Sequence, residues 1–422
     1  MNMHLHLRHF FRLQPLGRTI AGTVLVILLS ACGGGGGGDG QASQWVATWF
    51  AAQQNYNEIG PAFGPPISIS NQTVRQIVHT SHGGNQVRIK LSNLFGTGPT
   101  TFSAVHVARS IGSGAIDVTT DRTMTFGGAA SVTLAAGAEQ WSDSVDLSVA
   151  TQSDLAVSLF VQGSVPVATS HLLGQQNNYT ASNNQVNAAT MSGATAGTFY
   201  FWLSEVDTSS TNQVKVVVAF GDSITDGYGS TVAANHRWPN LFDNRVQAAA
   251  GSVGKASVVN AGISGNRWLH DLVGPAGQTR FARDVLGVSG ATHVVIFLGI
   301  NDIGFATPLP AQAVTSDQIV AAIVAAIAQA KSKKMKVFLA TLMPYEGSAS
   351  YSASGETERQ AVNAYIRSAS GVDGVIDFDK VMQDPSQPAS LLPAYNSGDH
   401  IHPNDAGYQA MANAINLSLF AN

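Results

Sequence analysis

Residues 214–227 read VKVVVAFGDSITDG, an apolar, β-branched run that passes directly into a turn rich in glycine and aspartate. A nearly unbroken apolar run of this length is typical of a strand covered on both faces, as in a parallel sheet. Further runs of this kind predict four more strands: ASVVNAGI (256–263), THVVIFLGI (292–300), KVFLATLM (336–343) and VIDF (375–378).

Segments with helical periodicity separate these runs. The clearest begins after Thr315-Ser316-Asp317, residue types that are common at helix N-termini, and places Ile319, Ile323 and Ile327 on one face. Three others cover residues 239–250, 356–368 and 405–419. Alternating strands and helices predict an α/β fold, a flavodoxin-like doubly wound parallel sheet with right-handed crossovers, over residues 210–422. Ligands of such sheets bind beyond the carboxyl ends of the strands.

Residues 44–209 have a different pattern, in which apolar and polar residues alternate with a period of two. Clusters of Gly, Pro, Asn and Ser separate short segments of this kind, for example TVRQIVHT (73–80), QVRIKLSN (86–93) and DLAVSLFVQ (154–162). This pattern predicts a separate all-β domain, an antiparallel sandwich with a jelly-roll-like arrangement.

Residues suited to acyl transfer follow the predicted strands. Ser223 lies at a strand-to-helix turn, where its hydroxyl projects above the sheet. A serine nucleophile needs a base and a group that orients the base, and His402 and Asp399 can supply both from one turn. The backbone N–H groups of Ser223 and Gly265, with the side-chain amide of Asn301, provide three candidate donors for an oxyanion.

These residues together resemble the SGNH (GDSL-type) hydrolase family, whose four blocks are named for Ser, Gly, Asn and His. The blocks match in the family's order as Ser223, Gly265, Asn301 and His402, with Asp399 completing the triad. Ile224 replaces the Leu of the GDSL name, which is an apolar exchange. The similarity extends to RWPN (237–240), GNRWL (265–269), RFARDVL (280–286), VIDFD (375–379) and GDHIHPNDAGY (398–408). The resemblance is to a secreted bacterial subgroup with an all-β N-terminal domain, and it implies a catalytic domain at residues 210–422.

Several neighbouring residues have simpler interpretations. Three aspartates are interpreted as hydrogen-bond partners that brace loops: Asp222, Asp226 and Asp302. His400 competes with His402 as the base, but the spacing from Asp399 and the family match favour His402. Arg267 and Trp268 follow Gly265, and the sequence leaves open whether they line the substrate pocket or pack in the core.

Composition excludes some classes of function. Only 11% of the 422 residues are charged and the net charge is −4, which argues against a nucleic-acid-binding protein. The single cysteine excludes an intramolecular disulfide framework and a multi-cysteine metal cluster. We expect no metal site and no organic cofactor.

The N-terminus resembles an export signal. Residues 19–31 are uncharged and mostly apolar, and arginines precede them, so residues 1–31 are predicted to form a signal peptide. The sequence LSAC (29–32) resembles the lipobox of bacterial lipoproteins, which implies lipidation of Cys32 and a glycine-rich tether at residues 32–43. Gly33 after the cysteine implies an outer-membrane location, with the lipid anchor as the only membrane contact. The alternative is an ordinary secretory signal with a chance cysteine.

The expected function is that of an exported serine ester hydrolase that acts through an acyl-enzyme. Short acyl or acetyl esters, including those of polysaccharides, are the expected substrates, with lysophospholipids or other lipid esters as the alternative. A rival hypothesis from another class is a surface glycan-binding protein whose hydrolase half is a non-catalytic scaffold. The sequence does not predict an oligomeric state.

Overall fold

The computed structural model describes residues 43–59 and 66–421. The predicted signal peptide (1–31), the tether up to residue 42 and the lipidation site Cys32 lie outside the described residues. Among the described helices, none combines the length and apolar character that a membrane crossing requires.

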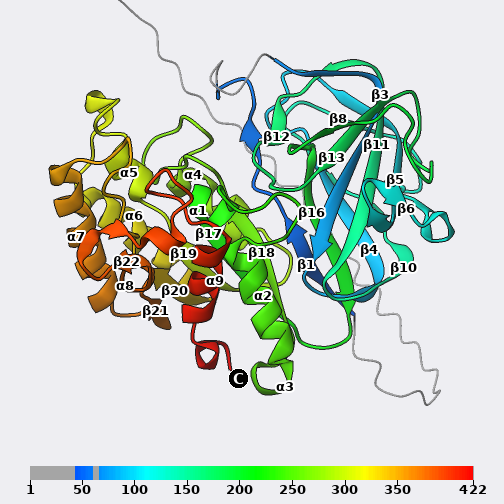
Figure 1. Ribbon diagram of the computed structural model, residues 1–422. Coiled ribbons are helices and arrows are strands. Elements are labelled where there is room, and N and C mark those ends of the chain that lie inside the picture. Colours follow the sequence, from blue (N-terminus) through cyan, green and yellow to red (C-terminus); the bar gives the residue numbers. More distant parts are fainter. Residues whose placement is uncertain (1–42, 60–65, 422) are drawn as a thin grey trace, which may run out of the picture. The chain divides into compact units, whose positions relative to one another are not determined.

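A five-stranded parallel sheet forms the centre of the C-terminal half (Figure 1). Its strands, in spatial order, are β18 (Ala256–Gly262), β17 (Lys215–Gly221), β19 (Ala291–Phe297), β20 (Lys336–Ala340) and β21 (Gly374–Ile376). Numbered along the chain, this order is 2-1-3-4-5, which occurs among doubly wound sheets. The five predicted strands and their parallel pairing are confirmed.

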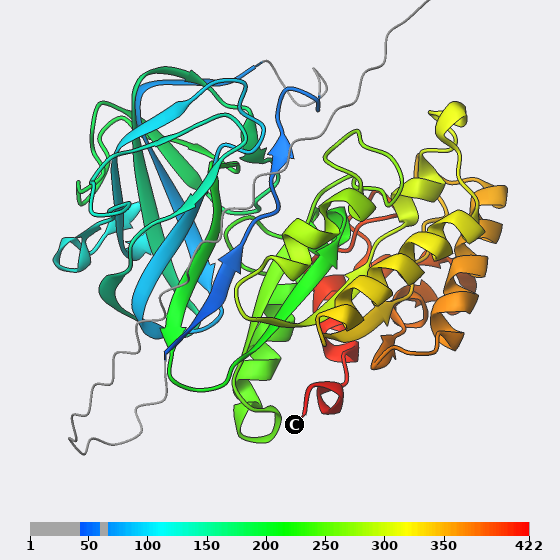
Figure 2. The same cartoon turned by 180° about the vertical axis from the view of Figure 1, so that it is seen from behind.

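Helices cover both faces of this sheet. In Figure 1, α2 (Trp238–Ala248) and α9 (Asp405–Ala414) lie in front of the sheet, and in Figure 2 α6 (Ser316–Ser332) lies in front of the opposite face. Thr315 caps α6 in a capping box with Gln318, as its sequence favours. The remaining helices are α1 (Ser223–Asp226), α3 (Ala250–Val253), α4 (Gly277–Phe281), α5 (Ile300–Gly304), α7 (Ala353–Ser368) and α8 (Phe378–Met382).

Antiparallel sheets form the N-terminal half, so its predicted all-β character is confirmed. The largest sheet contains β14 (Thr195–Gly197), β13 (Asn178–Ser182), β3 (Ser68–Thr80), β11 (Ser153–Pro166), β5 (Thr100–Gly112), β6 (Ala115–Ile116), β7 (Arg122–Thr123) and β8 (Val132–Leu134). A second sheet contains β1 (Gln44–Phe50), β16 (Leu203–Ser210), β4 (Gly84–Ser92), β10 (Val145–Val149) and β9 (Glu139–Trp141). Apolar side chains of both sheets share one core. The narrower flavodoxin-like and jelly-roll descriptions stay predictions.

The remaining strands form two small sheets. One contains β15 (Tyr200–Phe201), β12 (Thr169–His171) and β2 (Gln54–Asn55), and the other contains β22 (Gln383–Asp384) and β23 (Gln387–Leu391). Between β15 and β16 the extended chain is interrupted at Trp202, whose φ of 57° is left-handed. The chain therefore leaves β15 and enters β16 in a different sheet.

Strand β1 joins the two halves. It pairs with β16, while its Val46 and Phe50 side chains belong to the core of the α/β half. The Ser257 hydroxyl of β18 donates to the carbonyl of Ala47 at 2.6 Å, and the Ala47 N–H donates to the Ser289 carbonyl at 3.1 Å. Because side chains of β1 contribute to the α/β core, the β half is an integral part of the packing of the α/β half.

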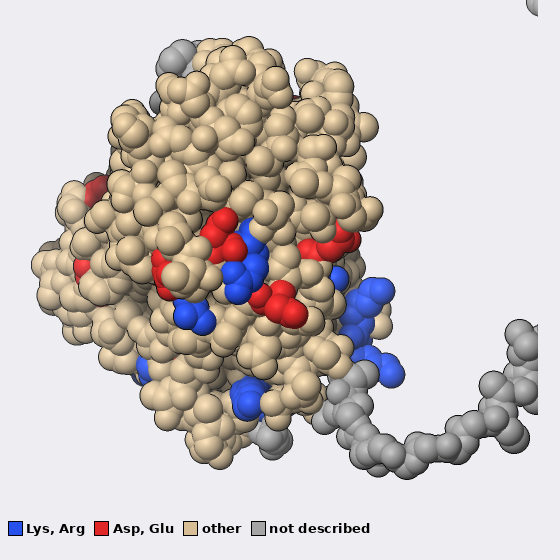
Figure 3. Space-filling view, turned by 90° about the vertical axis from the view of Figure 1, so that its right-hand side faces the viewer, with Lys and Arg blue, Asp and Glu red and all other residues tan. Residues whose placement is uncertain are grey.

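Charged side chains are few on the face shown in Figure 3. Some Lys and Arg side chains near its centre lie next to Asp and Glu, and others stand apart from them toward its lower and right edges. This face agrees with the low charged fraction of the sequence.

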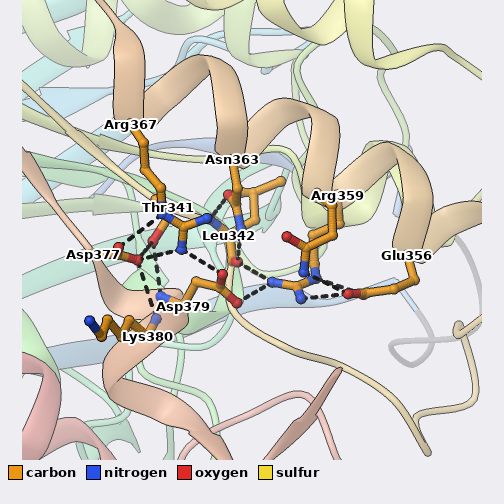
Figure 4. Close-up of polar contacts among 10 residues, drawn as sticks. Thr341, Leu342, Glu356, Arg359, Asn363, Arg367, Asp377, Asp379 and Lys380 are labelled. Carbon is orange, nitrogen blue, oxygen red and sulfur yellow. Dashed lines mark hydrogen bonds and ion pairs between the residues drawn. The ribbon is translucent and has the colours of Figure 1, made fainter. Parts of the chain in front are cut away.

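A buried ionic network fixes α7 against the end of β20 (Figure 4). The guanidinium of Arg359, which is completely buried, lies between the carboxylates of Glu356 and Asp379 and donates to the Leu342 carbonyl at 2.7 Å. Arg367 contacts Asp379 from its other side. Such a pairing compensates charges that would otherwise be costly to bury.

Candidate active site

Ser223 occupies the first position of α1, directly beyond the carboxyl end of β17. The Asp222 side chain caps this helix by accepting the Ile224 N–H at 3.0 Å. Burial raises the pKa of Asp222 to about 7. The cap holds the turn so that the Ser223 hydroxyl faces the chain segment before α9.

Ser223, His402 and Asp399 form a continuous hydrogen-bonded relay. His402 Nε2 lies 2.7 Å from Ser223 Oγ, and His402 Nδ1 lies 2.5 Å from Asp399 Oδ2. The serine and the histidine are separated by 179 residues in sequence. The structure therefore brings the three predicted triad residues together in the Ser–His–Asp order of a catalytic triad.

The loop around Asp399 holds the imidazole in one orientation. Asp399 Oδ1 accepts the backbone N–H groups of His402 at 2.9 Å and Ile401 at 3.1 Å. Burial opposes ionisation of Asp399, but the hydrogen bonds from the His402 ring and backbone outweigh it and lower the pKa well below the usual value. An ionised Asp399 requires the proton of the neutral ring on Nδ1, which leaves Nε2 free to accept the serine proton.

The predicted oxyanion donors lie at the ends of the neighbouring strands. Gly265 follows β18 with a φ of 76°, a left-handed conformation that favours glycine. A Cβ on Gly265 would also approach the Val273 side chain to 2.9 Å. Asn301, in α5 beyond β19, donates one amide hydrogen to the Asn266 carbonyl at 3.0 Å and keeps a second for a ligand. Among the described residues, no group accepts from the Ser223 or Gly265 N–H.

The three aspartates interpreted as loop-bracing partners do brace loops. Asp222 caps α1, as described above. Asp226 accepts the N–H of Ser264 at 3.1 Å and its hydroxyl at 2.7 Å. Asp302 accepts the N–H groups of Trp268 at 2.7 Å and Leu269 at 3.1 Å. These bonds tie the Gly265 loop to α1 on one side and to α5 on the other.

The structure shows which role Trp268 and Arg267 have, and it shows where His400 lies relative to the relay. Trp268 is fully buried and its indole donates to the Leu298 carbonyl at 2.8 Å, so it is a packing residue. Arg267 is also buried and stacks over Phe305. His400 Nδ1 lies 3.1 Å from the Asn396 amide, and its ring lines an open cavity of about 580 Å³. Its ring bonds neither Ser223 nor Asp399, so the geometry favours His402 as the base.

Tyr228 is a site residue that sequence reasoning missed. Its ring lies against the His402 ring, with centroids 4.5 Å apart, and it is 43% exposed. Its only sequence signal is a position just after the GDSITDG turn.

No group of three or more His, Cys, Asp or Glu residues in the described ranges could hold a metal ion.

Residues 219–410, which contain all the residues of this relay, match the model of the GDSL-like Lipase/Acylhydrolase family. This part of the chain is a GDSL-like lipase/acylhydrolase domain. The match confirms the family expected from the sequence and, at the level of reaction class, a carboxylic ester hydrolase. No curated protein shows a significant match to the chain.

Solved structures similar to this GDSL domain include three enzymes. A GDSL-like lipase from Bacteroides thetaiotaomicron is 24% identical, with 49% of this chain and 87% of that chain covered and a TM-score of 0.36. An alpha/beta hydrolase from the metagenome of Lake Arreo, Spain, is 23% identical (49% and 94% covered, TM-score 0.39). A catalytic mutant of an acetylxylan esterase from Geobacillus stearothermophilus is 23% identical (47% and 91% covered, TM-score 0.38).

Proposed function

We propose that the chain is a serine esterase that works through an acyl-enzyme on Ser223. The observation that carries this proposal is the unbroken relay from Ser223 Oγ through the His402 ring to the Asp399 carboxylate. A buried serine that only capped its helix would need neither a base at 2.7 Å nor a carboxylate behind that base.

In the first half of the proposed reaction, His402 Nε2 takes the hydroxyl proton while Ser223 Oγ bonds to the ester carbonyl carbon. The resulting oxyanion is held by the N–H groups of Ser223 and Gly265 and by the free amide hydrogen of Asn301. The tetrahedral intermediate then breaks its bond to the alcohol oxygen. The alcohol leaves with the proton that His402 returns, and the acyl group stays on Ser223.

In the second half, water replaces the alcohol. His402 takes a proton from the water as the water oxygen bonds to the acyl carbon, and the same donors hold the second oxyanion. The intermediate breaks its bond to Ser223 Oγ, which regains a proton from His402, and the carboxylic acid is released. The scheme uses no metal and no organic cofactor.

For the substrate, we propose short acyl or acetyl esters of a hydroxyl-rich alcohol, such as an acylated polysaccharide. The open cavity beside His400 supports this choice, because its lining includes the uncharged polar side chains of Gln387 and Ser390. Its one carboxylate, on Glu346, favours a neutral alcohol over the phosphate of a lysophospholipid. A series of acyl esters of increasing chain length, alongside acetylated xylan and a lysophospholipid, distinguishes these substrates.

We expect a fluorophosphonate probe to label the purified wild-type chain on Ser223, because the relay activates that hydroxyl. Peptide mapping of the labelled protein identifies the modified residue. Heat-denatured protein is the control, since the relay requires the folded chain. Absence of labelling on folded protein would favour the rival hypothesis of a glycan-binding protein with a non-catalytic scaffold.

We also propose that the chain is exported and held at the outer membrane by a lipid on Cys32. The lipobox-like sequence before Cys32 supports this proposal. Expressed in a Gram-negative host, the wild-type chain should incorporate labelled palmitate and Cys32→Ala should not. Equal incorporation by both chains would contradict lipidation at this cysteine.

A further inference from the structure

His171, at the end of β12, is a buried residue of the β half that contacts the GDSL domain. Its Nε2 lies 2.9 Å from Asp226 Oδ1, and its Nδ1 lies 2.9 Å from the Ala52 carbonyl oxygen. The Ala52 carbonyl can only accept, so Nδ1 carries a hydrogen, and a ring that also donates from Nε2 to the Asp226 carboxylate is an imidazolium. Burial alone would lower the pKa of His171, but the Asp226 carboxylate outweighs it and raises the pKa, which agrees with a charged ring.

Asp226 connects this imidazolium to the predicted oxyanion loop. The carboxylate is 1% exposed, and its second oxygen accepts both hydrogen bonds from Ser264, the residue before Gly265. Asp226 also lies in α1, three residues after Ser223. One buried carboxylate therefore joins the β half, the helix of the proposed nucleophile and the loop that carries an oxyanion donor.

A carboxylate this deeply buried needs a compensating charge. Arg237 is close enough to His171 to lower the pKa of its ring through charge repulsion. Its guanidinium, however, donates to Asn240 and to the Gly174 carbonyl and not to Asp226. Among the described residues, His171 is the only cationic group hydrogen-bonded to Asp226.

We propose that His171 is a positioning residue for the ester hydrolase: it fixes Asp226, which in turn fixes the direction of the Gly265 N–H. This inference rests on the proposed function of Ser223 and extends it, because it makes a residue of the β half part of the catalytic arrangement. The Asn266 N–H closes the turn around Gly265 by donating to the Ile263 carbonyl at 3.0 Å, and the two bonds at Ser264 anchor this turn to α1.

The test compares His171→Ala and His171→Gln with wild type in the full chain, using a nitrophenyl acetate substrate. We expect His171→Ala to lower kcat between about 10- and 100-fold with little change in KM, because a displaced donor weakens transition-state binding. The Gln amide can still donate to Asp226, so His171→Gln should recover part of kcat. Such a recovery would also show that the loss in His171→Ala is not a simple folding defect. Hydrogen exchange of peptides covering residues 263–266 should increase in His171→Ala, while exchange in β19 and β20 should not.

His106→Ala is the matched control, because His106 forms a similar pair with Asp121 at 2.8 Å inside the β half, without contact with α1. It should leave kcat and exchange of residues 263–266 unchanged. Unchanged exchange in His171→Ala overturns the inference regardless of activity. Faster exchange with wild-type kcat also overturns it, since the loop would then move without consequence for catalysis. If the wild-type chain hydrolyses no ester, the proposed function fails, and the catalytic role of His171 fails with it.

Discussion

Replacing Ser223 with alanine is expected to lower kcat for a nitrophenyl ester by up to about a million-fold, with the fold intact. The hydroxyl supplies the atom that bonds to the substrate, and no neighbouring group of the relay can replace it. Among the described residues its hydroxyl bonds only to His402 Nε2, so its loss removes little stability. Initial rates of purified protein, with circular dichroism and a thermal unfolding curve, measure both effects.

The control for this variant is Ser230→Ala, in the loop that follows the same helix. Ser230 is also buried, but its hydroxyl donates to the Gly227 carbonyl at 2.7 Å and lies outside the relay. Its alanine variant should keep turnover close to the wild-type value. Wild-type turnover by folded Ser223→Ala would show that another group is the nucleophile.

Replacing Asp399 with asparagine is expected to lower kcat by about 10⁴-fold. The asparagine carbonyl can still accept the backbone N–H groups of Ile401 and His402, so the loop should keep its shape. The amide, however, donates to His402 Nδ1 and so places the ring's proton on Nε2. In that tautomer the ring cannot accept the Ser223 proton, and the charge that stabilises the imidazolium is also lost.

Asp405→Asn tests whether any His–Asp pair near the site has this effect. Asp405 Oδ2 lies 2.8 Å from His236 Nδ1, in a pair of similar geometry that does not include Ser223. Rates of both variants on the same ester should therefore differ by several orders of magnitude. A comparable, small loss in both would show that Asp399 does not set the tautomer of His402.

The parallel strands and the α6 helix were predictable because their signals are local. A β-branched run such as residues 214–220 is typical of a strand covered on both faces, and β17 occupies residues 215–221. In α6, Ile319 and Ile323 are buried as their four-residue spacing predicts. The short strands β2 and β12 had no such signal, since two or three residues carry no readable period.

The roles of Arg267, Trp268 and His171 depended on contacts that sequence cannot display. Trp268 packs because the Leu298 carbonyl lies where its indole can donate, and that carbonyl belongs to another part of the chain. His171 precedes Asp226 by 55 residues and lies in the other half of the fold. Nothing in the spacing of these two residues predicts a contact between them.

Residue order and residue type were enough to identify the GDSL family, the α/β class of the C-terminal half and the candidates Ser223, Asp399 and His402. These inferences needed only short-range patterns, because strand ends of a parallel sheet meet at one edge wherever they occur in the chain. The distances within the relay, the packing roles of Arg267 and Trp268 and the link from His171 through Asp226 to the Gly265 loop came from the tertiary structure. Each of these depends on contacts between segments of the chain, and the separation of such segments in sequence carries no information about their separation in space.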